Sequence, residues 1–262
     1  MVDYGKKIRM LERLKSKQRF CVFCGGNTEG NTVDHVPPIV TFDLRSRPAG
    51  YEFLACRECN HGSRRADEVF GLISRFHPGP IDSRRKNELD KLLHSVGQKD
   101  QWLLYEMMPE IGDSLPKTPR IPPNTRHMNV SGPILNRRMR TSCGKMGLAF
   151  HFRITGEIVP PNGGVFYRWY SNVNRLMDEM PDDFIRLCGP PETLKQGTWS
   201  VEKQFTVSTA ASPDGQFTGH FSTFRFSFAV LTIAAHDISL LADAPQENVL
   251  RPGFLKIESE DF

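Results

Sequence analysis

The chain has 262 residues, of which 39% are apolar and 24% are charged, a composition that is ordinary for a globular protein and excludes a collagen-like or strongly disordered chain. No run approaches 18 uninterrupted apolar residues, and the charged N-terminus lacks a signal-peptide core, so we expect a cytoplasmic protein with no membrane partner. The net charge is +4, and the excess lies in residues 1–75, with 13 Lys and Arg against 9 Asp and Glu. Within it, residues 1–20 hold seven basic and two acidic side chains, a basic segment that suits a polyanionic partner or, in the simpler interpretation, a solvated helix face.

The chain opens with a helix and a cysteine knuckle. Apolar residues at helical spacing predict a helix over residues 2–17. The sequence Cys21-Val-Phe-Cys24 then predicts a tight knuckle, because the glycines that follow, Gly25 and Gly26, suit the left-handed backbone such a turn often needs.

Two short strands and a helix follow the knuckle. Residues 32–36 predict a strand that two prolines end, since proline cannot donate to a strand ladder. Residues 51–55 predict a second strand, which leads directly into the pair Cys56 and Cys59, and residues 60–76 predict a helix with one apolar face. The order of elements indicates a ββα unit with a cysteine pair at the start of each half.

The remaining chain predicts helices first and strands later. Helices are expected over 83–95, 99–110, 131–148 and 166–180, a Pro-rich connector over 109–123, and strands from Phe205 and over 217–234, with a hairpin turn at Asp214-Gly215. The expected fold class is therefore α+β: a zinc-bound ββα-metal module in residues 1–80, a helical connector in 81–123, and an α+β domain with antiparallel strands in 124–262.

The two cysteine pairs predict a structural zinc site. Four thiolates in two C-x-x-C pairs can surround one Zn²⁺ tetrahedrally, and the intervening residues close as a hairpin. The ligands are Cys21, Cys24, Cys56 and Cys59. With no open ligand position, this ion would stabilise the fold and take no part in catalysis. The alternatives are unrelated cysteine couples or a redox pair, but no thioredoxin-like βαβ pattern surrounds either couple.

Three residues between or directly after the cysteine pairs resemble the pattern of a known family. Asp34-His35 lies on the strand between the cysteine pairs, and Asn60 directly follows Cys59. Over about residues 18–76, the chain resembles the HNH, or His-Me finger (ββα-metal), endonucleases in the four-cysteine form of phage junction-resolving enzymes. The resemblance implies that His35 is the general base and that Asp34 and Asn60 hold a catalytic Mg²⁺ or Mn²⁺, for which oxygen ligands are suited.

Each of these residues can also be interpreted without the resemblance. Adjacent strand residues point to opposite faces, so one of Asp34 and His35 can reach a metal while the other reaches a water. A helix that begins at Asn60 would favour a phosphate near its positive end. Asn60 is also an ordinary helix N-cap residue, and Asp-His dipeptides are common, so the nuclease hypothesis depends on their joint position in the cysteine frame.

The helix after Asn60 departs from the family pattern, which has a further His or Asn there. Glu68 is a candidate third metal ligand, and its neighbour Asp67 is an alternative; both can equally lie on a solvated helix face. His61 is also available. Three basic side chains are candidates for phosphate contacts or for plain solvent exposure: Arg57, Arg64 and Arg65.

Residues 124–262 are less informative. The segment Lys145–His151, with Thr155-Gly-Glu, resembles one that accompanies HNH modules in bacterial proteins, and no chemistry follows from it. His151, His220 and His236 are interpreted as packing or surface residues, and Cys143 and Cys188 as buried free thiols. The alternating phenylalanines of 217–228 favour a strand with one buried face over a stacking platform for single strands.

The functional expectation is a metal-dependent endonuclease that hydrolyses phosphodiester bonds in nucleic acid, with DNA as the expected partner. One alternative is a zinc-ribbon module that binds nucleic acid without hydrolysis, and another is a protein-interaction scaffold. Target specificity, DNA against RNA, and the oligomeric state, a homodimer included, stay open.

Overall fold

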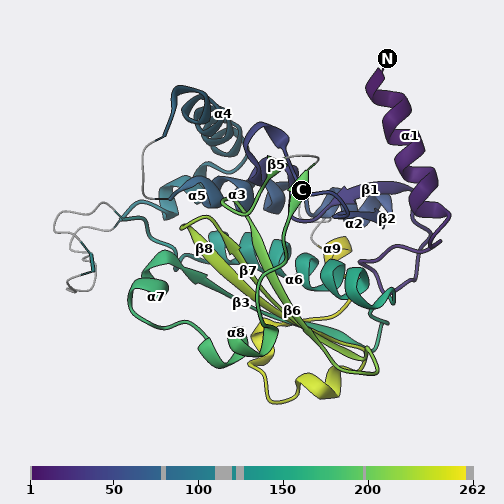
Figure 1. Ribbon diagram of the computed structural model, residues 1–262. Helices are drawn as coiled ribbons and strands as arrows, with labels where there is room; N and C mark the ends of the chain where they lie inside the picture. The colour runs from purple at the N-terminus through teal and green to yellow at the C-terminus, as the bar shows by residue number, and fades with distance from the viewer. Residues whose placement is uncertain (1, 78–80, 110–119, 122–126, 197–198, 258–262) are drawn as a thin grey trace.

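A computed structural model describes residues 2–77, 81–109, 120–121, 127–196 and 199–257 (Figure 1). The fold is α+β, as predicted, with an antiparallel hairpin near the N-terminus and a five-stranded antiparallel sheet in the C-terminal half. None of the helices in the described ranges has both the length and the apolar character needed to cross a membrane.

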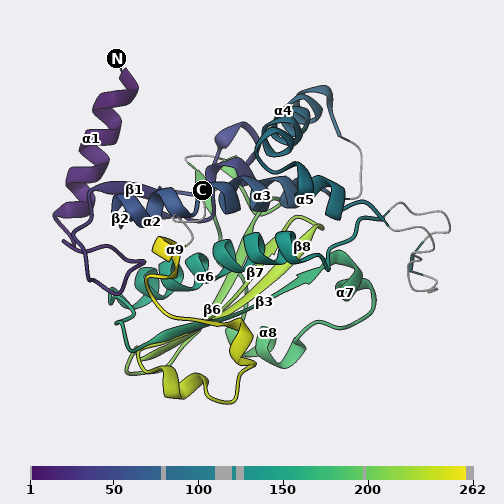
Figure 2. The ribbon, with the colours of Figure 1, turned by 180° about the vertical axis from the view of Figure 1, so that it is seen from behind.

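The N-terminal module has the predicted order of elements. It comprises α1 (Val2–Lys15), β1 (Thr32–His35), β2 (Glu52–Ala55), α2 (Arg57–Gly62) and α3 (Arg64–Arg75), with two 3₁₀ turns, Ile39–Thr41 and Asp43–Arg45, between the strands. β1 and β2 pair antiparallel, with His35 opposite Glu52. The predicted helix over 60–76 is instead two helices, since α2 already begins at Arg57 and Ser63 separates it from α3. α1 projects from this module at one end of the molecule (Figures 1 and 2).

Two further helices, α4 (Ser83–Lys99) and α5 (Gln101–Glu106), agree with the predictions for 83–95 and 99–110. Most of the expected Pro-rich connector, 109–123, lies outside the described residues. The side chain of Glu106 then caps the next helix, because its carboxylate accepts the N–H groups of Ile134 and Leu135 at 2.9 and 2.8 Å.

That next helix, α6 (Pro133–Thr155), is the centre of the fold. It lies between α3 and α5 on one side and the large sheet on the other (Figures 1 and 2). Every residue from 141 to 151 is buried, which is typical of a helix covered all round. Gly147 permits the close approach to the sheet, since a Cβ there would lie 2.3 Å from the Val165 side chain. The helix extends past the predicted end at 148, to the left-handed Gly156.

The sheet has the strand order β6-β7-β8-β3-β9. Its strands are β3 (Gly164–Ser171), β6 (Thr206–Ala211), β7 (Phe217–Phe224), β8 (Phe228–Ala235) and β9 (Val249–Leu250). The predicted strand over 217–234 is thus a hairpin, and the Asp214-Gly215 turn lies between β6 and β7 as expected. Small elements complete the chain: α7 (Asn172–Leu176), α8 (Asp182–Cys188), β4 (Lys195–Gln196), β5 (Trp199–Ser200), 3₁₀ turns at Ile238–Leu241 and Gln246–Asn248, and α9 (Phe254–Ile257).

The predicted helix over 166–180 is wrong in its first part, because Phe166 to Ser171 belong to β3, which pairs with both β8 and β9. Within that range, α7 (Asn172–Leu176) is helical. Val165 and Tyr167 face the main core, whereas Phe166 and Tyr170 join a second apolar cluster on the opposite face. Apart from the exposed Arg168, apolar and aromatic side chains therefore occupy both faces of the strand from Val165 to Tyr170. The strand thus lacks the alternation that distinguishes a strand from a buried helix.

The N-terminal module and the sheet share one apolar core. Tyr51 of the first hairpin packs edge to face on Phe150 and Phe205, with ring centroids 5.8 Å apart in each pair. Phe70 of α3 meets Phe224 and Phe228 in the same manner, at 4.8 and 4.9 Å. Apolar residues of the N-terminal module and of the sheet thus belong to the same core, and α6 contacts both α3 and the sheet.

Candidate metal centre and Asp34 cluster

The four paired cysteines meet at one point. The Sγ atoms of Cys21, Cys24, Cys56 and Cys59 all lie within 4.8 Å of one another, and each residue is at most 1% exposed. Tetrahedral Zn–S bonds of about 2.3 Å require sulfur atoms about 4 Å apart, so this donor set fits a structural zinc ion. Among the described residues, no other group of three or more His, Cys, Asp and Glu side chains converges in this way.

Two glycines and a lysine from α9 shape the first knuckle. Gly25 and Gly26 have φ of +67° and +75°, as the sequence predicts, and the N–H of Cys21 donates to the Thr28 carbonyl at 2.9 Å. Lys256 of α9 donates to the Thr28 hydroxyl at 2.8 Å. Hydrogen bonding with Cys21 lowers the pKa of Cys24, and the charge of Lys256 contributes in the same direction. Sequence reasoning missed Lys256 because it lies 228 residues beyond Thr28 in the chain.

Asn60 connects the second knuckle to β1. Its side-chain amide donates to the Thr32 hydroxyl at 3.0 Å and to the Val33 carbonyl at 3.3 Å. Asn60 lies inside α2 and is not its first residue, so the prediction that a helix begins at Asn60 is wrong. The argument for a phosphate at that helix start therefore no longer applies. Its described contacts fix the strand that carries Asp34 and His35.

Asp34 and His35 point away from each other, as neighbours on a strand do. Asp34 is 5% exposed, whereas His35 is half-buried at the end of β1. The backbone N–H of His35 donates to Asp34 Oδ1 at 2.8 Å, which couples the two residues locally. Opposite His35 on β2, Glu52 accepts from Arg47 at 2.8 Å.

A lysine from α6 reaches the Asp34 carboxylate. The Nζ atom of Lys145 lies 2.9 Å from both carboxylate oxygens of Asp34, 2.8 Å from Asp67 Oδ2 and 2.8 Å from the Ser63 hydroxyl. It also lies 5.8 Å from the ring centroid of Phe23 in the first knuckle. We call Asp34, Ser63, Asp67 and Lys145 the Asp34 cluster.

Burial and charge oppose each other in this cluster. Burial raises the pKa of Asp34 to about 6, although the positive charge of Lys145 acts in the opposite direction. Burial also disfavours the Lys145 ammonium, but the carboxylates of Asp34 and Asp67 outweigh it and raise the lysine pKa above its ordinary value. The cluster is therefore an ion pair at neutral pH. The sequence offered no signal for Lys145 beyond its place in a segment of uncertain chemistry.

The other predicted site residues lie apart from this cluster. The Glu68 carboxylate, a candidate metal ligand, accepts from Lys99 of α4 at 2.6 and 2.8 Å. Arg57 and Arg64 are exposed and Arg65 is half-buried, so the first two are accessible to a phosphate backbone. For the predicted divalent ion, the arrangement does not fit, because the Asp34 carboxylate is held by the Lys145 ammonium.

The histidines of the C-terminal half form a buried hydrogen-bonded series. His151 Nδ1 lies 3.0 Å from the Thr218 hydroxyl and its Nε2 lies 2.9 Å from Nε2 of His236. His220 contacts the same Thr218 hydroxyl at 3.1 Å and Thr209 at 3.2 Å. His151 and His220 are thus packed core residues with polar partners, as the sequence suggested, and Cys143 and Cys188 are buried free thiols.

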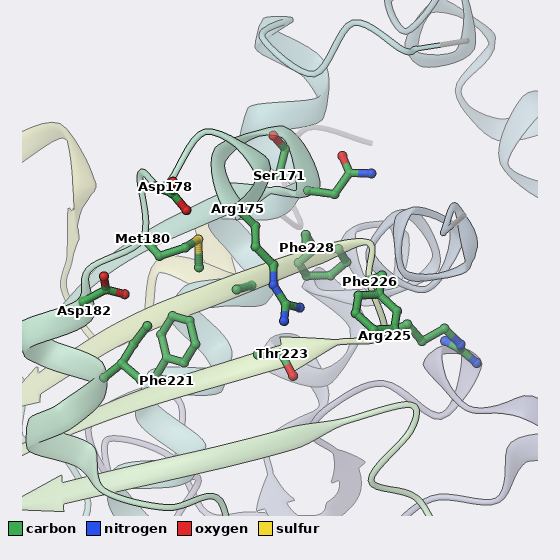
Figure 3. Close-up of a pocket in the computed structure, with 13 residues that line it drawn as sticks. Ser171, Arg175, Asp178, Met180, Asp182, Phe221, Thr223, Arg225, Phe226 and Phe228 are labelled. Atoms are coloured by element: carbon green, nitrogen blue, oxygen red, sulfur yellow. The ribbon is translucent and has the colours of Figure 1, made fainter. Parts of the chain in front are cut away.

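A separate pocket of about 460 Å³ lies beside the β7–β8 turn, among residues from α7, α8 and the two strands (Figure 3). Arg175 extends across it, with its guanidinium 5.2 Å from the centroid of the Phe226 ring. Phe226 is 62% exposed, whereas Phe224 and Phe228 belong to the core. None of the pocket residues belongs to the cysteine centre or the Asp34 cluster.

In comparisons with known proteins, no family profile, no curated protein and no solved structure matches this chain.

Proposed function

We propose that this protein is an endonuclease that hydrolyses phosphodiester bonds in DNA, with His35 as the general base. The observation that carries the proposal is the attachment of β1 to the cysteine centre through Asn60, whose amide binds Thr32 and Val33. This contact fixes the first half of β1, the strand whose last residue is the half-buried His35. A general base needs such a position, because it must be both fixed and accessible to water.

In the proposed reaction, the His35 imidazole accepts a proton from a water molecule as the water oxygen attacks phosphorus. The bond from phosphorus to the leaving oxygen breaks, and that oxygen takes a proton from solvent. Arg57 and Arg64 are exposed on α2 and α3 and supply positive charge for the phosphate backbone. Zinc at the four cysteines would stabilise the module. A catalytic Mg²⁺ or Mn²⁺ would add charge stabilisation, but no step is assigned to it because Asp34 already binds Lys145.

The test is cleavage of supercoiled plasmid by the zinc-loaded protein, with Mg²⁺ or Mn²⁺ supplied. We expect His35→Ala to reduce the rate of nicking by at least about 10²-fold, the usual contribution of a general base. The unfolding temperature and zinc content should stay unchanged, since the half-buried His35 is not part of the core.

The matched control is His61→Ala, which removes an exposed histidine from α2 of the same module. Its cleavage rate should equal that of the wild-type protein. A folded, zinc-containing His35→Ala variant that cleaves at the wild-type rate would contradict the role of His35.

The second candidate is a zinc-containing module that binds nucleic acid without hydrolysis. The ion pair between Asp34 and Lys145 favours it, because that carboxylate is not free to bind a catalytic cation. This candidate predicts salt-sensitive DNA binding and no cleavage with Mg²⁺, Mn²⁺ or Ni²⁺. Binding that persists in His35→Ala, without cleavage by either protein, would favour it over the nuclease.

A further inference from the structure

We propose that the Lys145 ammonium is the resident cation of the Asp34 cluster and that it excludes divalent metal ions from the Asp34 carboxylate. The proposal rests on the proposed function only in that Asp34 Oδ1 accepts the backbone N–H of His35, the proposed general base. Lys145 is then a positioning residue for β1, although its helix lies far from the four cysteines in the sequence.

The first argument is that the ammonium is fully satisfied. A lysine ammonium has three N–H donors, and three side chains accept from Nζ at 2.8–2.9 Å: Asp34, Asp67 and Ser63. Lys145 is 1% exposed, so no water replaces any of these partners. A cluster with two carboxylates and one ammonium leaves a single negative charge, which is far less costly to bury than the two carboxylates alone.

The second argument is that a divalent ion and the ammonium would need the same oxygens. Mg²⁺ binds oxygen at about 2.0–2.1 Å, and a cation at that distance from Asp34 would lie against Nζ, which is 2.9 Å from both Asp34 oxygens. Binding of the ion would therefore require Lys145 to leave a site from which solvent is excluded.

The third argument is that α6 cannot easily withdraw the lysine. The helix is in close contact with the sheet on its other face, where a Cβ at Gly144 would lie 2.5 Å from Leu250 and one at Gly147 2.3 Å from Val165. The lysine thus comes from a helix fixed between two layers. Through Asp34 Oδ1, which also accepts the backbone N–H of His35, it holds the end of β1 in place.

The experiment measures Mn²⁺ binding to the zinc-loaded full chain by electron paramagnetic resonance, because bound Mn²⁺ loses the signal of the free hydrated ion. We expect the wild-type protein to have no Mn²⁺ site that depends on Asp34. Its Mn²⁺ binding should therefore equal that of Asp34→Asn. Lys145→Ala leaves space beside two carboxylates, so it should gain about one bound Mn²⁺ per chain, and Mn²⁺ should raise its unfolding temperature.

Two variants separate space from charge. Lys145→Met removes the charge but keeps an apolar chain in the space, so it should bind no Mn²⁺. Lys145→Ala with Asp67→Asn should lose most of the gained binding, because one of the two carboxylates is absent.

Wild-type Mn²⁺ binding that Asp34→Asn abolishes would overturn the proposal, as would a folded Lys145→Ala that gains no Mn²⁺ site. If Lys145→Ala does not fold, the comparison of wild type with Asp34→Asn decides alone. Cleavage is not measured in any of these experiments, so their failure is distinct from a failure of the nuclease proposal.

Discussion

The cysteine centre and the interior of the α6–sheet half differ in how they bring polar groups together. All four sulfur ligands come from residues 21–59, and the hairpin β1–β2 joins the two knuckles that carry them. The buried polar groups of the other half come from distant segments, since His151 of α6 meets Thr218 of β7 and His236 beyond β8. One region is organised by a short stretch of chain with four converging cysteines, the other by the packing of the whole fold.

The difference shows where each region obtains its stability. A small hairpin with a few short helices buries little apolar surface by itself, so a metal ion is expected to supply much of its free energy of folding. The sheet and α6 belong to a large core, which the N-terminal module shares and which can offset the cost of burying histidines that are hydrogen-bonded. The Asp34 cluster lies between the two, with carboxylates from the N-terminal module and an ammonium from α6.

Zinc removal should have the largest effect and should be confined to one region. Chelation, or Cys56→Ser, removes binding free energy on the order of 10 kcal/mol from the N-terminal module. We expect amide protection to fall throughout residues 20–76, measured by hydrogen exchange, while β7 and β8 keep theirs. The native protein should contain about one zinc per chain by elemental analysis.

The matched control for zinc removal is Cys188→Ser, which changes a buried thiol of the second apolar cluster. This variant should keep its zinc and the exchange pattern of residues 20–76. A protein with no zinc, or with equal loss of protection in both halves on chelation, would contradict the division into a metal-dependent and a packing-dependent region.

Breaking the ion pair between the regions should have the next largest effect. Lys145→Met leaves Asp34 buried without its cation, which we expect to lower the free energy of unfolding by about 3–5 kcal/mol in urea denaturation. Adding Asp34→Asn should recover most of that loss, because the uncompensated charge of the Asp34 carboxylate is then removed as well.

A partly exposed pair between α3 and α4 provides the comparison. Lys99→Met removes the partner of Glu68, and its cost should be at most about 1 kcal/mol because solvent screens this pair. Equal costs for Lys145→Met and Lys99→Met would mean that the Asp34 cluster is no more dependent on its cation than a surface pair.

The same contrast explains which features the sequence could predict. The knuckles, the left-handed Gly25 and Gly26 and the hairpin follow from residues that are neighbours in the chain, and these predictions are confirmed. Lys145 could not be placed beside Asp34, because their contact depends on α6 packing between two layers. The prediction of a helix at β3 is wrong for a related reason: apolar packing on both faces of β3, which removes the alternating pattern, is a property of the assembled fold.

Acid should have the smallest effect per residue of the three and should act on the α6–sheet half. Burial lowers the pKa of His151 to about 4 and that of His220 to about 3, against an ordinary value of 6.5. Between pH 6.5 and these values, the unfolded chain binds protons that the folded protein does not, so stability falls as the pH falls. From pH 7 to pH 5, each histidine should contribute a loss of about 2 kcal/mol in the free energy of unfolding.

The variant His220→Gln isolates this contribution, because glutamine does not titrate but can still bond to Thr209 and Thr218. Its free energy of unfolding, measured with urea at both pH values, should fall by about 2 kcal/mol less than that of the wild-type protein. Protonation of the cysteine centre affects both proteins equally and cancels in the difference. His61→Gln, which changes an exposed side chain, should show the full wild-type pH dependence. If His220→Gln does so as well, the buried histidines do not couple folding to protons, and the two regions differ in metal dependence alone.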